Sequence, residues 1–321
     1  MTEQTTVGSP GNGAGATGNL GGHERSREQR EIAARRGLSE GALVEARVGG
    51  QVVRLRTDWP LTLHRLGAVG PVIGLTCNQL ATIETVAIYR NIATRGPAAQ
   101  ISDLQTDLCL FLSEWRTGFA VTEERGSDKD PQRSLQFFDA RGIAVHKVLL
   151  PAGGDTDAFD ELVRRQASGN QRPIAEGEAV AVASATDPTG SPKPGAGRDA
   201  PLPMIHSIDT ASAHPFAGPM WSRRVAKESL GHVLETAIAA EMPLLVMVGN
   251  RGAIHNHAGP LRELRRLDSW LTIRDPNLNL HIDGSGVESA WVVRKATPDG
   301  VVTSLELYDR GGEMIVYLAR L

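Results

Sequence analysis

Short runs of apolar or alternating residues, separated by turn residues, fill two long stretches of the chain. Alternation with a period of two is typical of strands, because successive side chains point to opposite faces of a sheet. The pattern therefore predicts an antiparallel sheet in each half of the chain. The predicted strands are residues 51–56, 72–76, 108–112, 118–122, 134–139 and 145–150, followed by residues 243–248, 253–257, 271–273, 278–282, 290–294, 301–307 and 314–318.

Helical periodicity accompanies both sets of strands. Ser39 is a favourable N-cap for a short helix, because its side chain can accept a hydrogen bond from the first helical turn. An Arg-, Glu- and Ala-rich segment ahead of it predicts an exposed helix, and apolar residues recur at helical spacing further along. The predicted helices are residues 24–37, 58–68, 157–166 and 225–240, together with the one that Ser39 caps.

Several sequence matches between the two halves share nearly the same offset. The offset is 170 residues for two segments, and 172 residues for a pair of asparagines that each follow an apolar run. A period this long exceeds the roughly 20–50 residues of solenoid units, so it indicates a duplicated domain. The seam between the copies is then the first candidate for a ligand site. The matches are residues 134–142 with 304–312, residues 107–111 with 277–281, and Asn78 with Asn250.

The predicted organisation has four parts. A disordered Gly-, Thr- and Ser-rich tail covers residues 1–23, and the first repeat covers residues 24–166. A flexible linker rich in Gly, Pro and Ser covers residues 167–222, and the second repeat covers residues 223–321. The expected fold class is α+β, with two tandem homologous repeats, each an antiparallel β-sheet with flanking helices.

The composition describes a globular protein. Apolar residues make up 40% of the chain and charged residues 22%, and the net charge is −3. This balance offers no broad basic field for nucleic acid, and no apolar run reaches the roughly 20 residues that cross a bilayer. Local arginine clusters, at residues 25–36 and at Arg262, Arg265 and Arg266, are interpreted as solvated helix faces. Two cysteines are too few for a disulfide framework, so these features together favour the cytoplasm.

Several segments together resemble one protein family closely, and two of them, residues 270–281 and 290–307, are the most specific. By these motifs the chain resembles the bacterial cytoplasmic haemin-degrading and haemin-transport proteins, the HemS/ChuS-like family. The resemblance covers roughly residues 26–166 and 223–320. The remaining motifs are Trp115–Arg116 with Phe119–Ala120, Ser134–Asp139 with Ala144–Val148, and Val248–Gly252.

The resemblance implies two tandem repeats with haem in a cleft between them. A histidine just after the linker would ligate the iron, an arginine on a first-repeat strand would cover the other face of the ring, and a lysine near the C-terminus would hold the propionates. Elementary chemistry agrees, because a crevice between sheets excludes water from an apolar ring. Imidazole is a common axial ligand of haem iron, and cations pair with carboxylates.

Two of these roles fall on defined positions of the motifs. The propionate lysine corresponds to Lys295, whose alternative interpretation is a solvated lysine at a strand end. The family's arginine belongs to a tract that reads Asp107–Phe111 here, so Cys109 replaces it. A cysteine can ligate haem iron as thiolate, but a strand cysteine is more often a small buried hydrophobe.

The axial histidine has two candidates, because the chain is shortened before the second repeat. His206 lies at a similar distance from the end of the first repeat, and His214 is the other candidate. The alternative for each is a solvated loop histidine. Near the C-terminus, Arg320 is a candidate substitute for a propionate contact that the family supplies beyond the last strand.

Four further histidines lie in predicted strands. His255 and His257 alternate, so they share one face of a sheet. They are interpreted either as part of a metal site that lacks an evident third ligand or as a polar surface. His146 and His281 are interpreted as structural.

These features predict a cytoplasmic haem-binding protein of iron acquisition, which accepts imported haem for delivery or for oxidative degradation that releases iron. The implied partners are haem itself, a haem importer and a reductant protein. A carrier needs only a pocket and one ligand, whereas haem-oxygenase-like cleavage also needs a distal donor that Cys109 does not obviously supply. The alternative is a degenerate family member that no longer binds haem and acts as a binding or regulatory module.

Overall fold

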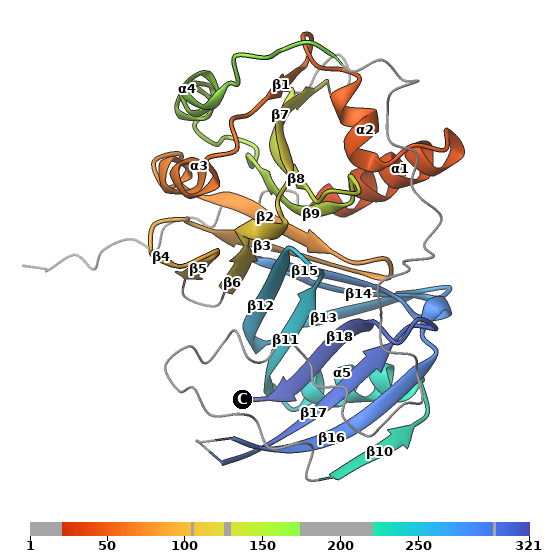
Figure 1. Cartoon of the computed structure of the whole chain (residues 1–321). Helices are drawn as coiled ribbons and strands as arrows, with labels where there is room; N and C mark the ends of the chain where they lie inside the picture. Colours follow the sequence, from red (N-terminus) through yellow and green to blue (C-terminus); the bar gives the residue numbers. More distant parts are fainter. Residues whose placement is uncertain (1–20, 104–105, 125–129, 174–220, 298–299) are drawn as a thin grey trace, which may run out of the picture.

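The computed structural model describes residues 21–103, 106–124, 130–173, 221–297 and 300–321. Two antiparallel sheets of nine strands each form the body of the molecule, with helices packed on their faces (Figure 1). Nearly all of the predicted tail and most of the predicted linker lie outside the described residues.

Each sheet combines strands from both repeats. In spatial order, the first sheet consists of β1 (Val52–Arg54), β7 (Thr117–Glu123), β8 (Gln132–Phe138), β9 (Ala144–Leu149), β2 (Val72–Cys77), β3 (Ala81–Ala87), β15 (Leu278–Asp283), β14 (Trp270–Asp275) and β13 (Glu263–Leu267). The second sheet consists of β10 (Trp221–Val225), β16 (Ser289–Thr297), β17 (Gly300–Tyr308), β18 (Met314–Arg320), β11 (Pro243–Gly249), β12 (Ala253–Pro260), β6 (Thr106–Phe111), β5 (Ala98–Asp103) and β4 (Ile92–Arg95).

The repeats meet along two seams of main-chain pairing. β3 pairs with β15 in the first sheet, and β12 pairs with β6 in the second. Figure 1 shows this exchange as blue strands of the second repeat continuing beneath the orange β2 and β3. The predicted α+β fold with two tandem repeats is confirmed, but each repeat lends three strands to the sheet of the other.

The strand register corrects one predicted offset. Thr82 and Ile254 occupy equivalent places, each opposite the last residue of the preceding strand. Thr82 pairs with His281 and Ile254 pairs with Cys109, so Cys109 corresponds to His281 at an offset of 172, and not to Asn279. The offset is 170 in β8, since the stretch from Thr117 to its partner Phe138 is two residues longer than the stretch from Ser289 to its partner Tyr308.

Five α-helices belong to the described part of the fold. They are α1 (Gly22–Arg35), α2 (Glu40–Glu45), α3 (Trp59–Leu66), α4 (Thr156–Gln166) and α5 (Ser229–Ala239). The predicted cap of α2 is confirmed, since Ser39 Oγ accepts a hydrogen bond from the Ala42 amide at 3.1 Å. α1 is less exposed than predicted, because it lies on the first sheet with His23, Ser26 and Ala33 buried.

The sequence pattern missed several strands, and three of them, β4, β10 and β13, lie at the edges of the sheets. Residues 263–267 form β13, a strand, so the interpretation of this arginine cluster as a helix face is wrong. The predicted helix over residues 225–240 begins only at Ser229, and its first predicted residue, Val225, is the last residue of β10. β3, β4 and β5 were also not predicted.

Each repeat has its own apolar core, which lies between its helices and one face of a sheet. α3 and α4 close the core of the first repeat, where Leu63 and Phe159 are buried. α5 closes the core of the second repeat by packing Leu234 against one face of the second sheet. The opposite face of the second sheet carries a different set of side chains.

Candidate functional site

The candidate site is the face of the second sheet that lies opposite α5. Cys109 on β6 is 7% exposed and packs in one apolar cluster with Met247, Ile254, Tyr317 and Ala319. These residues come from β6, β12, β11 and β18, so the cluster crosses the seam between the repeats. We call this surface the Cys109 face.

Tyr317 and Met247 are site residues that the motif comparison missed. The sequence pattern that could have identified Tyr317 is the alternation along β18. Val316 and Leu318 belong to the α5 core, whereas Tyr317 and Ala319 belong to the Cys109 face. Met247 is the Cα partner of Tyr317 on the neighbouring strand. Burial raises the pKa of the Tyr317 hydroxyl above its usual value, so this group stays protonated.

A polar group stands at the other end of the Cys109 face. Lys295 Nζ lies 3.2 Å from Glu306 Oε1, and only 16% of the lysine side chain and 3% of the glutamate side chain are exposed. Ser304 Oγ donates to the same carboxylate oxygen at 3.0 Å, and Tyr308 donates to Oε2 at 2.6 Å. Burial and the Glu306 charge raise the pKa of Tyr308. The alternative reading of Lys295 as a solvated lysine is therefore wrong.

Cys109 and Lys295 mark the two ends of the face. They lie five strands apart, on β6 and β16. Four strands lie between them, so the two side chains stand at opposite ends of the face. The apolar cluster links them, since Val302, the Cα partner of Lys295, packs against it.

The structure does not place Arg320 on the Cys109 face. Arg320 is the Cα partner of Leu244, which is buried in the α5 core. Alternation along β18 also puts Arg320 on the side of Leu318, opposite Ala319. The second sheet therefore lies between Arg320 and Cys109, so the expected propionate contact from Arg320 would have to come from the opposite side of the sheet.

The two histidines predicted to bind iron, His206 and His214, lie outside the described residues. Among the described residues, no group of three or more His, Cys, Asp or Glu side chains is arranged to hold a metal ion.

The first sheet has an equivalent face, but α1 covers it. His281, the counterpart of Cys109, stacks on His23 at the start of α1 with ring centroids 4.0 Å apart. Arg30, from the middle of the helix, donates to Cys77 Sγ at 2.9 Å. Gly22 is required at the start of the helix, because a Cβ there would lie 2.7 Å from Glu84 Oε1. We call this surface the α1 face.

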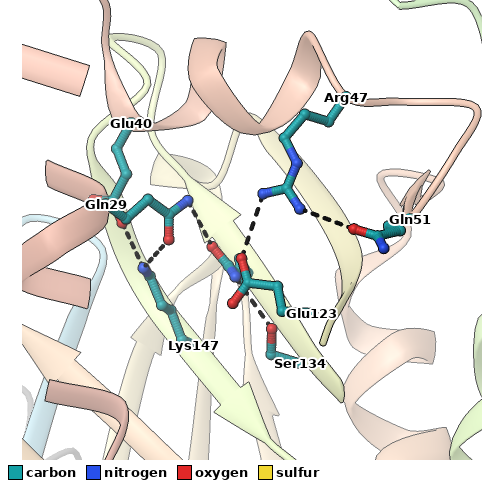
Figure 2. A network of polar contacts seen from close by, with 8 residues as sticks. Gln29, Glu40, Arg47, Gln51, Glu123, Ser134 and Lys147 are labelled. Carbon is teal, nitrogen blue, oxygen red and sulfur yellow. Dashed lines mark hydrogen bonds and ion pairs between the residues drawn. The ribbon is translucent and has the colours of Figure 1, made fainter. Parts of the chain in front are cut away.

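A polar network fills the end of the α1 face that corresponds to Lys295 and Glu306 (Figure 2). Lys147 Nζ lies 2.5 Å from Glu40 Oε1 and 3.2 Å from Gln29 Oε1. A cavity of only about 20 Å³ remains among these side chains. The α1 face is therefore occupied by the protein's own helix and side chains.

Histidines predicted to lie on a polar surface are instead buried between the sheets. His255 is 0% exposed and His257 is 3% exposed, so the surface interpretation is wrong. His255 Nε2 lies 2.7 Å from Thr85 Oγ1. His146, which was interpreted as structural, lies between Thr76 Oγ1 at 2.9 Å and the Tyr89 hydroxyl at 2.8 Å.

Burial lowers the pKa of each of these histidines. The pKa falls to about 3 for His146 and to about 4 for His257, and it lies well below the usual value for His255. All three rings are therefore neutral in the folded protein at neutral pH.

Within the described ranges, no helix combines the length and the apolar character that crossing a bilayer would require.

Fold and site together define a class: a tandem α+β repeat protein with exchanged strands and an amphipathic ligand face built from both repeats. The haemin-degrading HemS.ChuX domain model matches residues 37–166 and again residues 207–319. The chain therefore belongs to the HemS/ChuX haemin-degrading domain family, as its motifs predicted.

Relatives with this architecture cover nearly the whole chain. The hemin transport protein HmuS of Yersinia pestis is 29% identical over 299 residues, which span 90% of this chain and 86% of the relative. The solved structure of holo-PhuS, a heme-binding protein from Pseudomonas aeruginosa, is 33% identical with a TM-score of 0.77, covering 93% of this chain and 90% of PhuS. The heme degrading enzyme ChuS of Escherichia coli O157:H7 is 26% identical with a TM-score of 0.75, covering 94% and 91%.

Proposed function

We propose that this protein binds haem on the Cys109 face and handles it in iron acquisition. The observation that carries the proposal is the arrangement of that face, with an apolar strip around Met247 and Tyr317 and a lysine at one end. Haem has the same character, since its ring is apolar and its propionates are carboxylates at one edge. The names of HmuS, PhuS and ChuS support this ligand.

We infer that His206 ligates the haem iron, with His214 as the alternative. The α1 face supplies the supporting geometry, because His281, the counterpart of Cys109, contacts a histidine at the start of a covering helix. A histidine opposite Cys109 would occupy the corresponding place. His206→Ala should then abolish the shift of the Soret band, whereas an unchanged spectrum assigns the ligand to His214.

Delivery is the part of the function that the described residues favour over degradation. Cys109 sits where the resemblance implies an arginine, and a thiol is a weak hydrogen-bond donor. Its apolar surroundings favour a role as part of the pocket wall. Haem would supply the redox chemistry of any ring cleavage, with a reductant protein as electron source, while this chain would bind the ring and exclude water from it.

We propose the cytoplasm as the site of action and a haem importer as the donor. Cys77 and Cys109 form no disulfide, and both lie buried in the fold. Cysteines kept as thiols fit a reducing compartment. A haem carrier in that compartment would receive its ligand from an importer and pass it onward.

Titration of the purified chain with haemin, followed at the Soret band, tests the proposal. A saturable shift with one haem per chain is expected, and addition of ascorbate in air then separates carriage from ring cleavage. No shift beyond that of free haemin, from a protein with folded circular dichroism, would contradict haem binding.

A binding or regulatory module without haem is the second candidate function. Cys109 in place of the arginine and a lysine that is already paired with Glu306 are the observations that favour it. The same titration decides between the two, since a module that has lost haem shows no saturable shift.

A further inference from the structure

Lys295 already has a carboxylate partner inside the protein. Glu306 is 2% exposed and accepts hydrogen bonds from Lys295, Ser304 and Tyr308. Ser304, Glu306 and Tyr308 occupy alternate positions of β17, and Lys295 lies on the neighbouring strand β16. All four side chains therefore stand on the Cys109 face. The lysine charge and the glutamate charge cancel, which leaves this end of the face close to neutral.

The fold itself does not demand a carboxylate at position 306. Its counterpart in the first repeat is Gln136, at an offset of 170, because Gln136 pairs with Lys147 as Glu306 pairs with Tyr317. Gln136 Nε2 donates to Ser134 Oγ at 3.1 Å, so a neutral amide fills the equivalent place and still contacts the equivalent serine. The charge of Glu306 is therefore specific to the second repeat and is not required by the fold.

A buried carboxylate beside a ligand-binding lysine has two opposing effects. It fixes the ammonium group in one position, because a charge-assisted hydrogen bond restrains the flexible side chain. It also competes for that ammonium, since a carboxylate of the ligand must share Lys295 with Glu306. Two carboxylates around one cation repel each other, and the repulsion is strong where water is excluded.

We propose that Glu306 is a positioning residue that holds Lys295 and competes with the ligand's carboxylates for it, and thereby keeps the ligand easy to release. This inference rests on the proposed function, in which the propionates of haem lie at Lys295. It makes the Lys295–Glu306 pair a device that limits affinity, which suits a protein that hands its ligand to an acceptor.

The pair yields a defined pattern of affinities. Glu306→Gln should bind haemin about tenfold more tightly and release it correspondingly more slowly, because the propionates no longer compete with a protein carboxylate for Lys295. Lys295→Met should bind about tenfold more weakly, because Glu306 is left facing the propionates without a cation. The double variant should return to within about threefold of the original affinity, because both charges are gone.

The experiment measures haemin affinity by the Soret shift, and release by transfer of haem to excess apomyoglobin. Each protein is tested with haemin and with haemin dimethyl ester, whose carboxylates are blocked. The affinity for the ester should be the same in all variants at positions 306 and 295. A substitution that merely disturbed the structure would change the affinity for both ligands. Glu123→Gln is the matched control, because Glu123 is the counterpart of Lys295 on the α1 face and lies 3.4 Å from Arg47 (Figure 2).

Each outcome has a defined meaning. Tighter haemin binding by Glu306→Gln, with the ester unaffected, supports the inference. Unchanged or weaker haemin binding overturns it, as does a change of equal size with the ester. If Glu306→Gln does not fold, the Lys295→Met protein and the double variant still test it, since removal of Glu306 must recover affinity. If the original protein binds neither ligand, the proposed function fails and this inference fails with it.

Discussion

Asn78 and Asn250 make the same hydrogen bonds in opposite directions across the centre of the molecule. Asn78 Nδ2, in the turn between β2 and β3, donates to the carbonyl of Ile315 in the second sheet at 2.8 Å. Asn250 Nδ2, in the turn between β11 and β12, donates to the carbonyl of Val145 in the first sheet at 2.9 Å. Each Oδ1 also accepts two amides of its own turn. The pair therefore fixes both turns and joins the two sheets.

Loss of either asparagine should destabilise the protein to a similar degree. Asn78→Ala and Asn250→Ala each leave partly buried carbonyls and amides without a partner, so we expect a loss of about 2–4 kcal/mol in the free energy of unfolding. Urea unfolding followed by circular dichroism measures this loss. The surface variant Asn91→Ala serves as the control and should change the free energy by less than about 0.5 kcal/mol.

Buried histidines should make the fold sensitive to acid. The pKa of His146 is about 3 in the folded protein, whereas an unfolded histidine titrates near 6.5. Between these values the unfolded chain binds more protons, so stability is complete above pH 6.5 and falls as the pH is lowered toward 3. His23, His257 and His281 act in the same direction, because their pKa values are lowered to about 3, 4 and 4.

Urea unfolding at several pH values between 7 and 4 checks this prediction. His146→Gln should have a shallower dependence, by about 1.4 kcal/mol per pH unit below 6, because one neutral ring has been removed. An unchanged slope in that variant would show that His146 is not kept neutral by the fold.

Glu84 should act in the opposite direction. Burial raises the pKa of Glu84 to about 7, and the folded state therefore binds more protons than the unfolded state between about pH 4.5 and 7. The penalty for its charge is present above pH 7 and is relieved as the pH falls. Glu84→Gln should thus gain stability at pH 8 relative to the original protein, and this gain should shrink toward pH 5. A constant difference at all pH values would contradict the raised pKa.

Cys109→Arg should change the chemistry of bound haem more than its binding. A guanidinium at this position would place strong hydrogen-bond donors on the Cys109 face, where the thiol is a weak one. We expect the loss of the Soret band with ascorbate in air to become about tenfold faster or more. Cys109→Ala is the matched control, because it also removes the thiol but adds no donor. Equal rates in the two variants would show that the limit on cleavage lies elsewhere.

Much of the fold could be predicted because duplication leaves a visible period in the sequence. The matched segments identified two α+β repeats, and alternation located strands such as β8 and β17 within two or three residues. The exchange of strands could not be predicted, because a period shows which segments are alike and not which of them pair. The two-residue error in the counterpart of Cys109 was also invisible, since a shift of two keeps every side chain on the same face.

The candidate site could be predicted only in part for the same kind of reason. The motifs located Cys109 and Lys295, but the pairing of Lys295 with Glu306 depends on the register between β16 and β17. His255 looked like a surface residue because its partner, Thr85, lies 170 residues earlier in the chain. The assignment of iron ligation to His206 or His214 stays a prediction.

The exchanged strands set a condition on synthesis of the chain. β3 has no neighbour on its open edge until β15 is made, and β6 has none until β12 is made. β15 begins 191 residues after β3 ends, so at about 5–20 residues per second the edge stays open for roughly 10–40 s. Unpaired strand edges attract other chains. Because β6 corresponds to β15, the half-made chain carries both surfaces of the missing contact, and two neighbouring ribosomes on one message would present complementary edges to each other.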